Sequence, residues 1–230
     1  MPEQTRELIL KVLQEKALLK LEVCGKTEEG FRELKKALSK IQEELTSAIP
    51  KVNSKNISIS YQDRGDFEAE FNMVDDTLFF IRHSNVFTFE NNHEIWKSSY
   101  VQEDHARSYC GKIFVYNFLS DSFKYNRTSD VGYLIARIFI NKENHFFVEG
   151  KRQLGFLYND FANDQFNPDS IRKVVESALL YSLDFDPYTP PYEQLQQLTV
   201  QEILDSSAKN RITTGKRLGF RFQVDKADPI

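Results

Sequence analysis

Residues 109–158 decide the fold, and they read YCGKIFVYNFLSDSFKYNRTSDVGYLIARIFINKENHFFVEGKRQLGFLY. Short runs of apolar and aromatic residues alternate in this stretch with short polar turns, a pattern typical of β-strands. Neighbouring strands that are joined by so few residues must be antiparallel, because a parallel pair needs a crossover of a dozen or more residues. The stretch therefore predicts the central part of an antiparallel sheet.

Two strands within this stretch are the most informative. Residues 112–118 are apolar on both faces, which predicts a central strand with a layer over each face. Residues 133–141 form the longest predicted strand, and Arg137 lies there in a row of aromatic side chains. Such a guanidinium must be paired or stacked. It could anchor an anion or a nucleobase, or it could pair with Glu149 or with a carboxylate from the loop at residues 91–107.

The sheet extends in both directions from these strands. Upstream, residues 57–61, 67–73, 78–81 and 86–89 alternate apolar and polar side chains or form short apolar runs between turns. Downstream, residues 122–126, 145–149 and 154–158 do the same. The pattern predicts about eight antiparallel strands.

The N-terminal fifty residues have a helical period instead. Residues 3–22 predict one helix, and Gly25 is a plausible stop because glycine tolerates the conformation that ends a helix. A second helix then carries apolar residues at steps of three and four, and Pro50 closes it; this seam comprises Phe31, Leu34, Leu38, Ile41 and Leu45. The expected product is a helical hairpin, which either docks with a partner or packs on the chain's own sheet.

The C-terminal third predicts more helix. Asn167 and Pro168 are suited to the first positions of a helix, and an apolar stripe follows them. Residues 184–192 contain prolines that exclude a helix, and a capping box at Thr199 begins another short helix. The predicted class is α+β, with a helical hairpin at 1–50 and a sheet domain with C-terminal helices at 51–230, or one continuous domain.

Two similar basic turns suggest a ligand site. The sequence Gly-Lys-Arg occurs at 150–152 and again at 215–217, in a chain whose net charge is −4. If the turns met, their cations and backbone N–H groups could bind a phosphate-containing ligand or nucleic acid. The candidate residues are Arg137, Lys151, Arg152, Lys216, Arg217 and Arg221. Charged hairpin turns that protect sheet edges would have the same sequence.

Several kinds of site are not indicated. Cys24 and Cys110 are the only cysteines, far apart in the sequence, which favours a reducing, cytoplasmic location over a disulfide scaffold. The histidines and carboxylates between residues 83 and 105 match no metal-ligand spacing. No nucleophile motif or phosphate-binding loop is present, so no catalytic residue, cofactor or metal is predicted. The N-terminus is unlike a signal peptide, and no window is apolar enough to cross a bilayer.

The sequence therefore favours a non-catalytic binding or assembly protein. It would act through the helical hairpin and an aromatic face of the sheet, with another protein or a second copy as its partner. The alternative is a phosphate or nucleic-acid binder that uses the basic turns and Arg137.

Overall fold

A computed structural model describes residues 3–49 and 57–184 of the chain. A long helix, α1 (Glu3–Ala48), precedes six strands, and a second substantial helix, α4 (Pro168–Leu183), follows them. The strands are β1 (Ile59–Asp63), β2 (Glu68–Met73), β3 (Asp76–Arg82), β4 (Cys110–Leu119), β5 (Tyr133–Asn141) and β6 (Phe146–Gly150). The α+β class and the antiparallel sheet are confirmed, but the described residues form six strands rather than about eight.

The sheet is a simple meander. The strands lie in the order β1-β2-β3-β4-β5-β6, and each pairs antiparallel with the next. β4 is central, as its apolar faces predict, and it pairs with β3 and β5. With ten residues it is also the longest strand, so the prediction that residues 133–141 form the longest one is wrong by one residue. The register between them shifts at Val115 and Tyr116, where Tyr116 pairs with Leu134 and one residue of β5 is left unmatched. Such a bulge bends the sheet locally.

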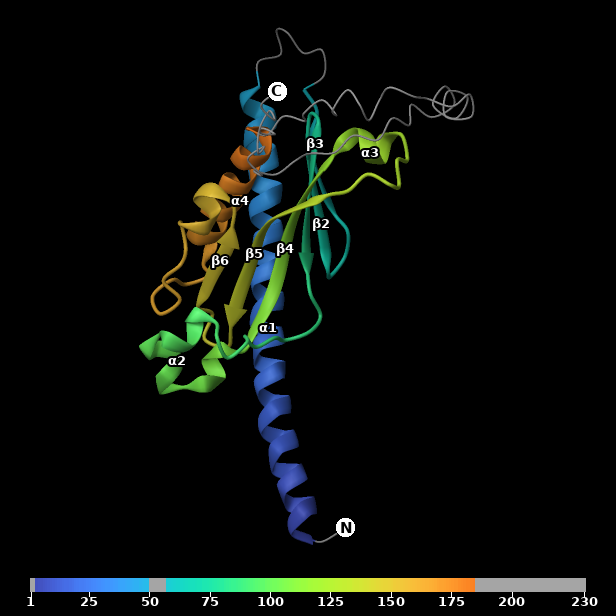
Figure 1. The fold of residues 1–230 in the computed structure, drawn as a ribbon. Coiled ribbons are helices and arrows are strands. Elements are labelled where there is room, and N and C mark those ends of the chain that lie inside the picture. Colours follow the sequence, from blue (N-terminus) through green and yellow to red (C-terminus); the bar gives the residue numbers. More distant parts are fainter. Residues whose placement is uncertain (1–2, 50–56, 185–230) are drawn as a thin grey trace, which may run out of the picture.

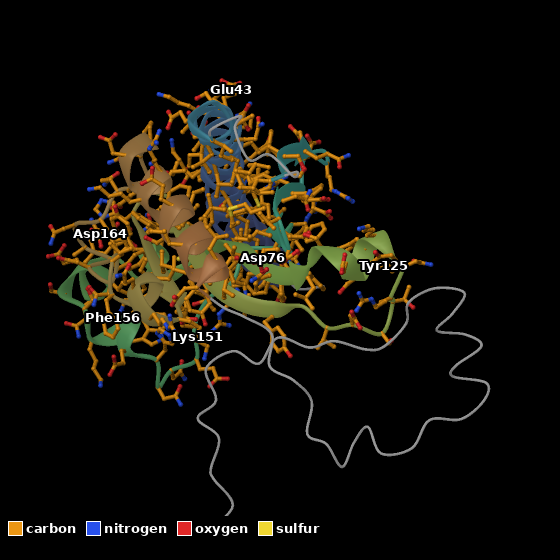
Figure 2. The ribbon with its side chains drawn as sticks, turned by 90° about the horizontal axis from the view of Figure 1, so that it is seen from above. Glu43, Asp76, Tyr125, Lys151, Phe156 and Asp164 are labelled. Atoms are coloured by element: carbon orange, nitrogen blue, oxygen red, sulfur yellow. The ribbon has the colours of Figure 1, made fainter. Side chains whose placement is uncertain are left out.

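Both long helices lie on the same face of the sheet (Figure 1). The core between them is almost wholly apolar and includes Phe71, Phe80, Ile113, Ile138 and Phe146, all 0% exposed. Figure 2, seen from above, shows α1 and α4 side by side with their side chains filling the space above the sheet. From α1 the core receives Phe31, Leu34, Leu38 and Ile41. These four members of the predicted seam pack on the chain's own sheet.

The predicted hairpin is a single helix. α1 runs through Gly25 without a break over 46 residues, a length of about 69 Å. A glycine inside a helix costs only about 1 kcal/mol relative to alanine. The packing of the buried stripe from Val23 to Ile41 offsets that cost, so Gly25 does not end the helix.

Two other glycines bring α1 close to the rest of the chain. A Cβ at Gly111 on β4 would lie 1.9 Å from the Thr27 Oγ1 of α1. A Cβ at Gly30 on α1 would lie 2.7 Å from the ring of Phe166. Thr27 itself is buried, and its hydroxyl donates to the carbonyl of Val23 at 2.7 Å. These small residues let the helix backbone approach the sheet.

α4 begins where the sequence predicts. The side chain of Asn167 accepts from the Ser170 N–H, and the Ser170 hydroxyl accepts from the Asn167 N–H, which forms a reciprocal cap. Pro168 occupies the first turn. On the exposed side of α4, the Arg172 guanidinium donates to Glu44 of α1, which links the two helices.

Three predicted strands are absent from the described sheet. Residues 86–89 make only one bridge, between Phe87 and Cys110, because the chain then turns over the sheet face. Residues 122–126 overlap the short helix α3 (Ser120–Lys124), whose Phe123 packs on Phe79 and Phe118. Residues 154–158 overlap a 3-10 helix at Arg152–Gly155 that buries Leu154. In these segments tertiary side-chain contacts take the place of strand pairing: Leu154 is buried, Phe87 is half-buried and Phe123 is 50% exposed.

The expectations for residues 185–230, including the linker, the capping box at Thr199 and the second basic turn, lie outside the described residues. Within the described ranges, every helix is too short or too polar to span a bilayer.

Candidate functional site

The N-terminal part of α1 is the least covered part of the molecule. N-terminal to Val23 the helix extends past the sheet, and no described element lies beside this part of it (Figure 1). We refer to residues 3–22 as the arm. Its large apolar side chains between Leu8 and Leu21 are 41–68% exposed, and they are Leu8, Ile9, Leu10, Val12, Leu13, Leu18 and Leu21. Soluble proteins seldom expose so continuous an apolar surface without a binding function.

The apolar residues of the arm lie on more than one side of the helix. Nine of the fourteen residues from Leu8 to Leu21 are apolar. At 3.6 residues per turn, Ile9 and Val12 continue the stripe that α1 buries against the sheet, whereas Leu10 and Leu21 lie on the opposite side. A helix that is apolar all round is normally buried. The sequence contained this signal, but interpreting the arm as half of a hairpin concealed it.

The second candidate surface is the face of the sheet that α1 and α4 do not cover. One row of paired residues crosses five strands of this face: Glu68 pairs with Ile81, Ile81 with Phe114, Phe114 with Arg137, and Arg137 with Glu149. We refer to this row, together with Lys112 and Tyr116, as the open face. Its central side chains are half-buried, and they are Ile81, Lys112, Phe114, Tyr116 and Arg137.

Only the two ends of this side of the sheet are covered by described elements. At one end, Phe123 of α3 packs 5.1 Å from Phe79 and 5.3 Å from Phe118, measured between ring centroids. At the other, the segment that contains α2 (Ser99–Glu103) forms a small core over Cys110 and Phe139. Figure 1 shows α3 and α2 at opposite ends of the sheet, with the front of β4 uncovered between them.

Lys112 has an unusual environment within the open face. Its ammonium lies 3.3 Å from the ring centroid of Phe87, 5.6 Å from that of Phe114 and 5.9 Å from that of Phe139. Burial and the nearby Arg137 guanidinium lower the pKa of Lys112, and Glu149 opposes this shift. Among the described residues no carboxylate pairs with it directly. No sequence pattern indicates this site, because the β3–β4 connection brings Phe87 and Lys112 together.

Arg137 is engaged within the same face. It forms an ion pair with Glu149 and stacks 5.6 Å from the ring of Phe139. Glu149 also lies 3.6 Å from the Nε2 of His93. The pairing that the sequence offered as one interpretation of Arg137 is therefore present. Arg137 remains 42% exposed at its side chain, so a ligand that binds the open face can still reach it.

The described basic turn lies elsewhere. Lys151 is exposed, and Arg152 pairs with Asp184 and stacks on the ring of Tyr181 at 5.6 Å. Both line a pocket of about 300 Å³ beside α4. In Figure 2, Lys151 lies on the opposite side of the molecule from Glu43 at the C-terminal part of α1. Lys216, Arg217 and Arg221 lie outside the described residues, so a site shared between the two turns stays a prediction.

The histidines of the region from 83 to 105 do not converge. His83 packs edge-on against Phe87, His93 faces Glu149, and His105 packs against Trp96. Within residues 3–49 and 57–184, no group of three histidine, cysteine, aspartate or glutamate side chains is placed to hold a metal ion. His93 and Glu149 do line a cleft of about 520 Å³, whose floor includes Phe147 and Phe161.

Among protein-family models, curated proteins and solved structures, none matches this chain. The arm and the open face are therefore the two features of the described residues that point to a function.

Proposed function

We propose that this chain is a non-catalytic assembly protein that associates with further copies of itself through the arm. The observation that supports the proposal is the run of seven large apolar side chains, 41–68% exposed, between Leu8 and Leu21. Exposing them to water is unfavourable by roughly 25 cal/mol per Å² of apolar surface. Burying them against another copy removes that cost and stabilises the assembly.

The continuity of α1 also supports this function. The same helix that contributes Phe31, Leu34, Leu38 and Ile41 to the core continues into the arm. An isolated helix of about twenty residues is only marginally stable in water. Here the folded body provides a helical turn from which the arm propagates, so the arm is ordered before it binds and loses less conformational entropy on association.

Light scattering coupled to size-exclusion chromatography tests the proposal. The wild-type chain is expected to elute with the mass of a dimer or larger assembly, and Leu10→Glu/Leu21→Glu to elute as a monomer. Gln4→Glu/Gln14→Glu is the matched control, because it adds the same charge to the arm without removing apolar surface. The proposal would be contradicted if the wild-type chain stayed monomeric up to about 1 mM. A dissociation constant of about 1 mM corresponds to only about 4 kcal/mol of binding free energy.

The phosphate-binding hypothesis has weaker support. Arg137 and Arg152, two of its six residues, are already paired with carboxylates, and three others lie outside the described residues. It remains a prediction with a direct measurement: salt-dependent binding of a nucleic acid that Lys151→Glu/Lys216→Glu abolishes.

A further inference from the structure

The open face lacks the layer that its composition requires. β4 is apolar on both sides, and helices α1 and α4 cover only one of them. A strand of this kind normally lies between two layers. Phe114 and Tyr116 are instead half-buried, with no described element above them. A covering element must therefore be apolar and at least as long as the uncovered row.

The arm meets both requirements. Its apolar stretch from Leu8 to Leu21 has fourteen residues, which span about 21 Å in a helix. The row from Glu68 to Glu149, whose last residue lies beside His93, crosses β2 to β6, a width of about 19 Å at the usual strand spacing. The two surfaces are thus similar in length, and the centre of the row is apolar at Ile81 and Phe114, whereas Glu68, Arg137 and Glu149 are charged.

The arm of one copy cannot reach its own open face. α1 packs on the opposite side of the sheet, and it continues straight past the edge as one helix (Figure 1). To fold back over Phe114, the helix would have to break near Val23, where it is already packed and 0% exposed. The arm that covers the face must therefore come from another copy.

One cation of the open face is left for a partner to pair with. Lys112 is the one cation of the open face that lacks a carboxylate partner among the described residues, whereas Arg137 has Glu149. The arm carries Glu7 just before its apolar stretch and Glu15 within it, beside Lys11, Lys16 and Lys20, and neither glutamate forms an ion pair within the described residues. A glutamate of the arm placed beside Lys112 would supply the missing negative charge and oppose the lowering of the Lys112 pKa.

Pairing of two arms along a single seam fits less well. The seam that continues the buried stripe consists of Ile9, Val12, Lys16 and Leu19, with a lysine at its centre. A two-stranded coiled coil along this seam would leave Leu10 and Leu21, on the other side, exposed. The open face is broad and lies between α2 and α3. It can therefore contact a wider part of the surface of the arm than a single coiled-coil seam does.

We infer that the arm of one copy docks onto the open face of a second copy, with Leu8–Leu21 lying across β3, β4 and β5. This inference rests on the proposed self-assembly and names the surface that receives the arm. The interface joins two different surfaces, so it is either reciprocal within a dimer or extends head to tail into larger assemblies.

Mixing two variants of the full chain tests the inference. Phe114→Asp alters the open face and leaves the arm intact, whereas Leu10→Glu/Leu21→Glu alters the arm and leaves the face intact. Each variant alone is expected to be monomeric, with an association constant reduced at least about tenfold from wild type. An equimolar mixture is expected to contain a species with one copy of each, because one intact arm and one intact face remain. Lys112→Glu is a second face variant, at a half-exposed position, for use if Phe114→Asp does not fold.

The outcomes separate the two levels of the proposal. If a folded face variant associates as strongly as wild type, the inference is wrong. That result is expected if two arms pair with each other, or if another segment of the same chain covers the face. The proposed self-assembly would still hold. If the arm variant associates as strongly as wild type, the proposed function itself is wrong. If folded face and arm variants are both monomeric and their mixture also stays monomeric up to about 1 mM, the arm does not bind the face.

Discussion

Gly25 and Gly111 show that a glycine's role depends on what surrounds it. Gly25 lies in α1 with nothing within 4 Å of a Cβ, whereas a Cβ at Gly111 would overlap Thr27. We expect Gly25→Ala to raise the free energy of unfolding by about 0.5–1 kcal/mol, because alanine restricts the unfolded chain and favours helix. We expect Gly111→Ala to lower it by about 1–3 kcal/mol or more through overpacking.

Urea unfolding followed by circular dichroism measures both changes. The pair forms its own control, since each substitution adds one methyl group at a glycine. Equal destabilisation by the two variants would show that the close approach at Thr27 does not govern the contact between α1 and β4.

Asp104 makes the stability of the fold depend on pH in the acidic range. Its carboxylate accepts from the Lys142 ammonium at 2.6 Å and from the Ala106 N–H at 2.9 Å, and these contacts lower the pKa of Asp104 from its ordinary value of 3.8. Because the folded-state pKa lies below the unfolded one, the contribution to stability is present above about pH 4. It is lost as the pH falls through the folded-state pKa.

Asp104→Asn should therefore flatten the fall in stability below pH 4 while lowering stability at neutral pH. Urea unfolding midpoints between pH 3 and pH 7 test this. The control is Glu94→Gln, which neutralises a carboxylate in the same segment whose side chain is 90% exposed. Its stability should vary with pH as that of wild type does. An Asp104→Asn profile parallel to that of wild type would contradict the assigned role.

At the scale of elements, α1 is divided into two parts with different tasks. Leu38 is 0% exposed against the sheet, whereas Leu18 on the arm is 62% exposed. Truncating a buried leucine to alanine costs about 2–5 kcal/mol, so Leu38→Ala should lower the free energy of unfolding by that amount. Leu18→Ala should change the stability of the monomer by less than about 0.5 kcal/mol.

This comparison is best made in the monomeric Leu10→Glu/Leu21→Glu background, by urea unfolding, so that association does not contribute. A loss of more than about 1 kcal/mol from Leu18→Ala in that background would mean that the arm packs on its own body.

Local patterns predicted the elements whose determinants are local. The structure contains the strands predicted at residues 112–118, 133–141 and 145–149, the cap at Asn167 and the pairing of Arg137 with Glu149. The break at Gly25 was wrong because the energy that maintains the helix comes from contacts with the sheet. The contact of Lys112 with Phe87 was invisible in the sequence, because it depends on how the chain leaves β3 and returns to β4.

Residues 122–126 and 154–158 illustrate the same limit. Both are short apolar runs between turns, and periodicity alone does not separate a strand from a single helical turn at that length. Phe123 is apolar and its ring lies 5.1 Å from that of Phe79, but it belongs to α3 rather than to a strand and is 50% exposed. The hydrophobic residues were thus identified correctly, whereas the element that presents them depends on the rest of the fold.

At the scale of the whole molecule, the body and the arm should differ in local stability. Residues 31–41 of α1 are packed in the core, and residues 3–22 make no contact with another described element that would slow their opening. Amide hydrogens exchange at rates set by local opening, so in a monomer the arm should exchange much faster than the packed part of the same helix.

Hydrogen exchange measured by mass spectrometry at low and high protein concentration therefore reports the role of the arm. In wild type we expect the arm and the strand segments 79–82 and 112–117 to become protected together as the concentration rises, because each covers the other. In Leu10→Glu/Leu21→Glu, exchange of both regions should be independent of concentration. Protection of the arm without protection of residues 112–117 would favour contact between two arms. Strong protection of the arm in the monomeric variant would show instead that the arm is a stable helix on its own. Association with a partner would then not be needed to keep the helix formed.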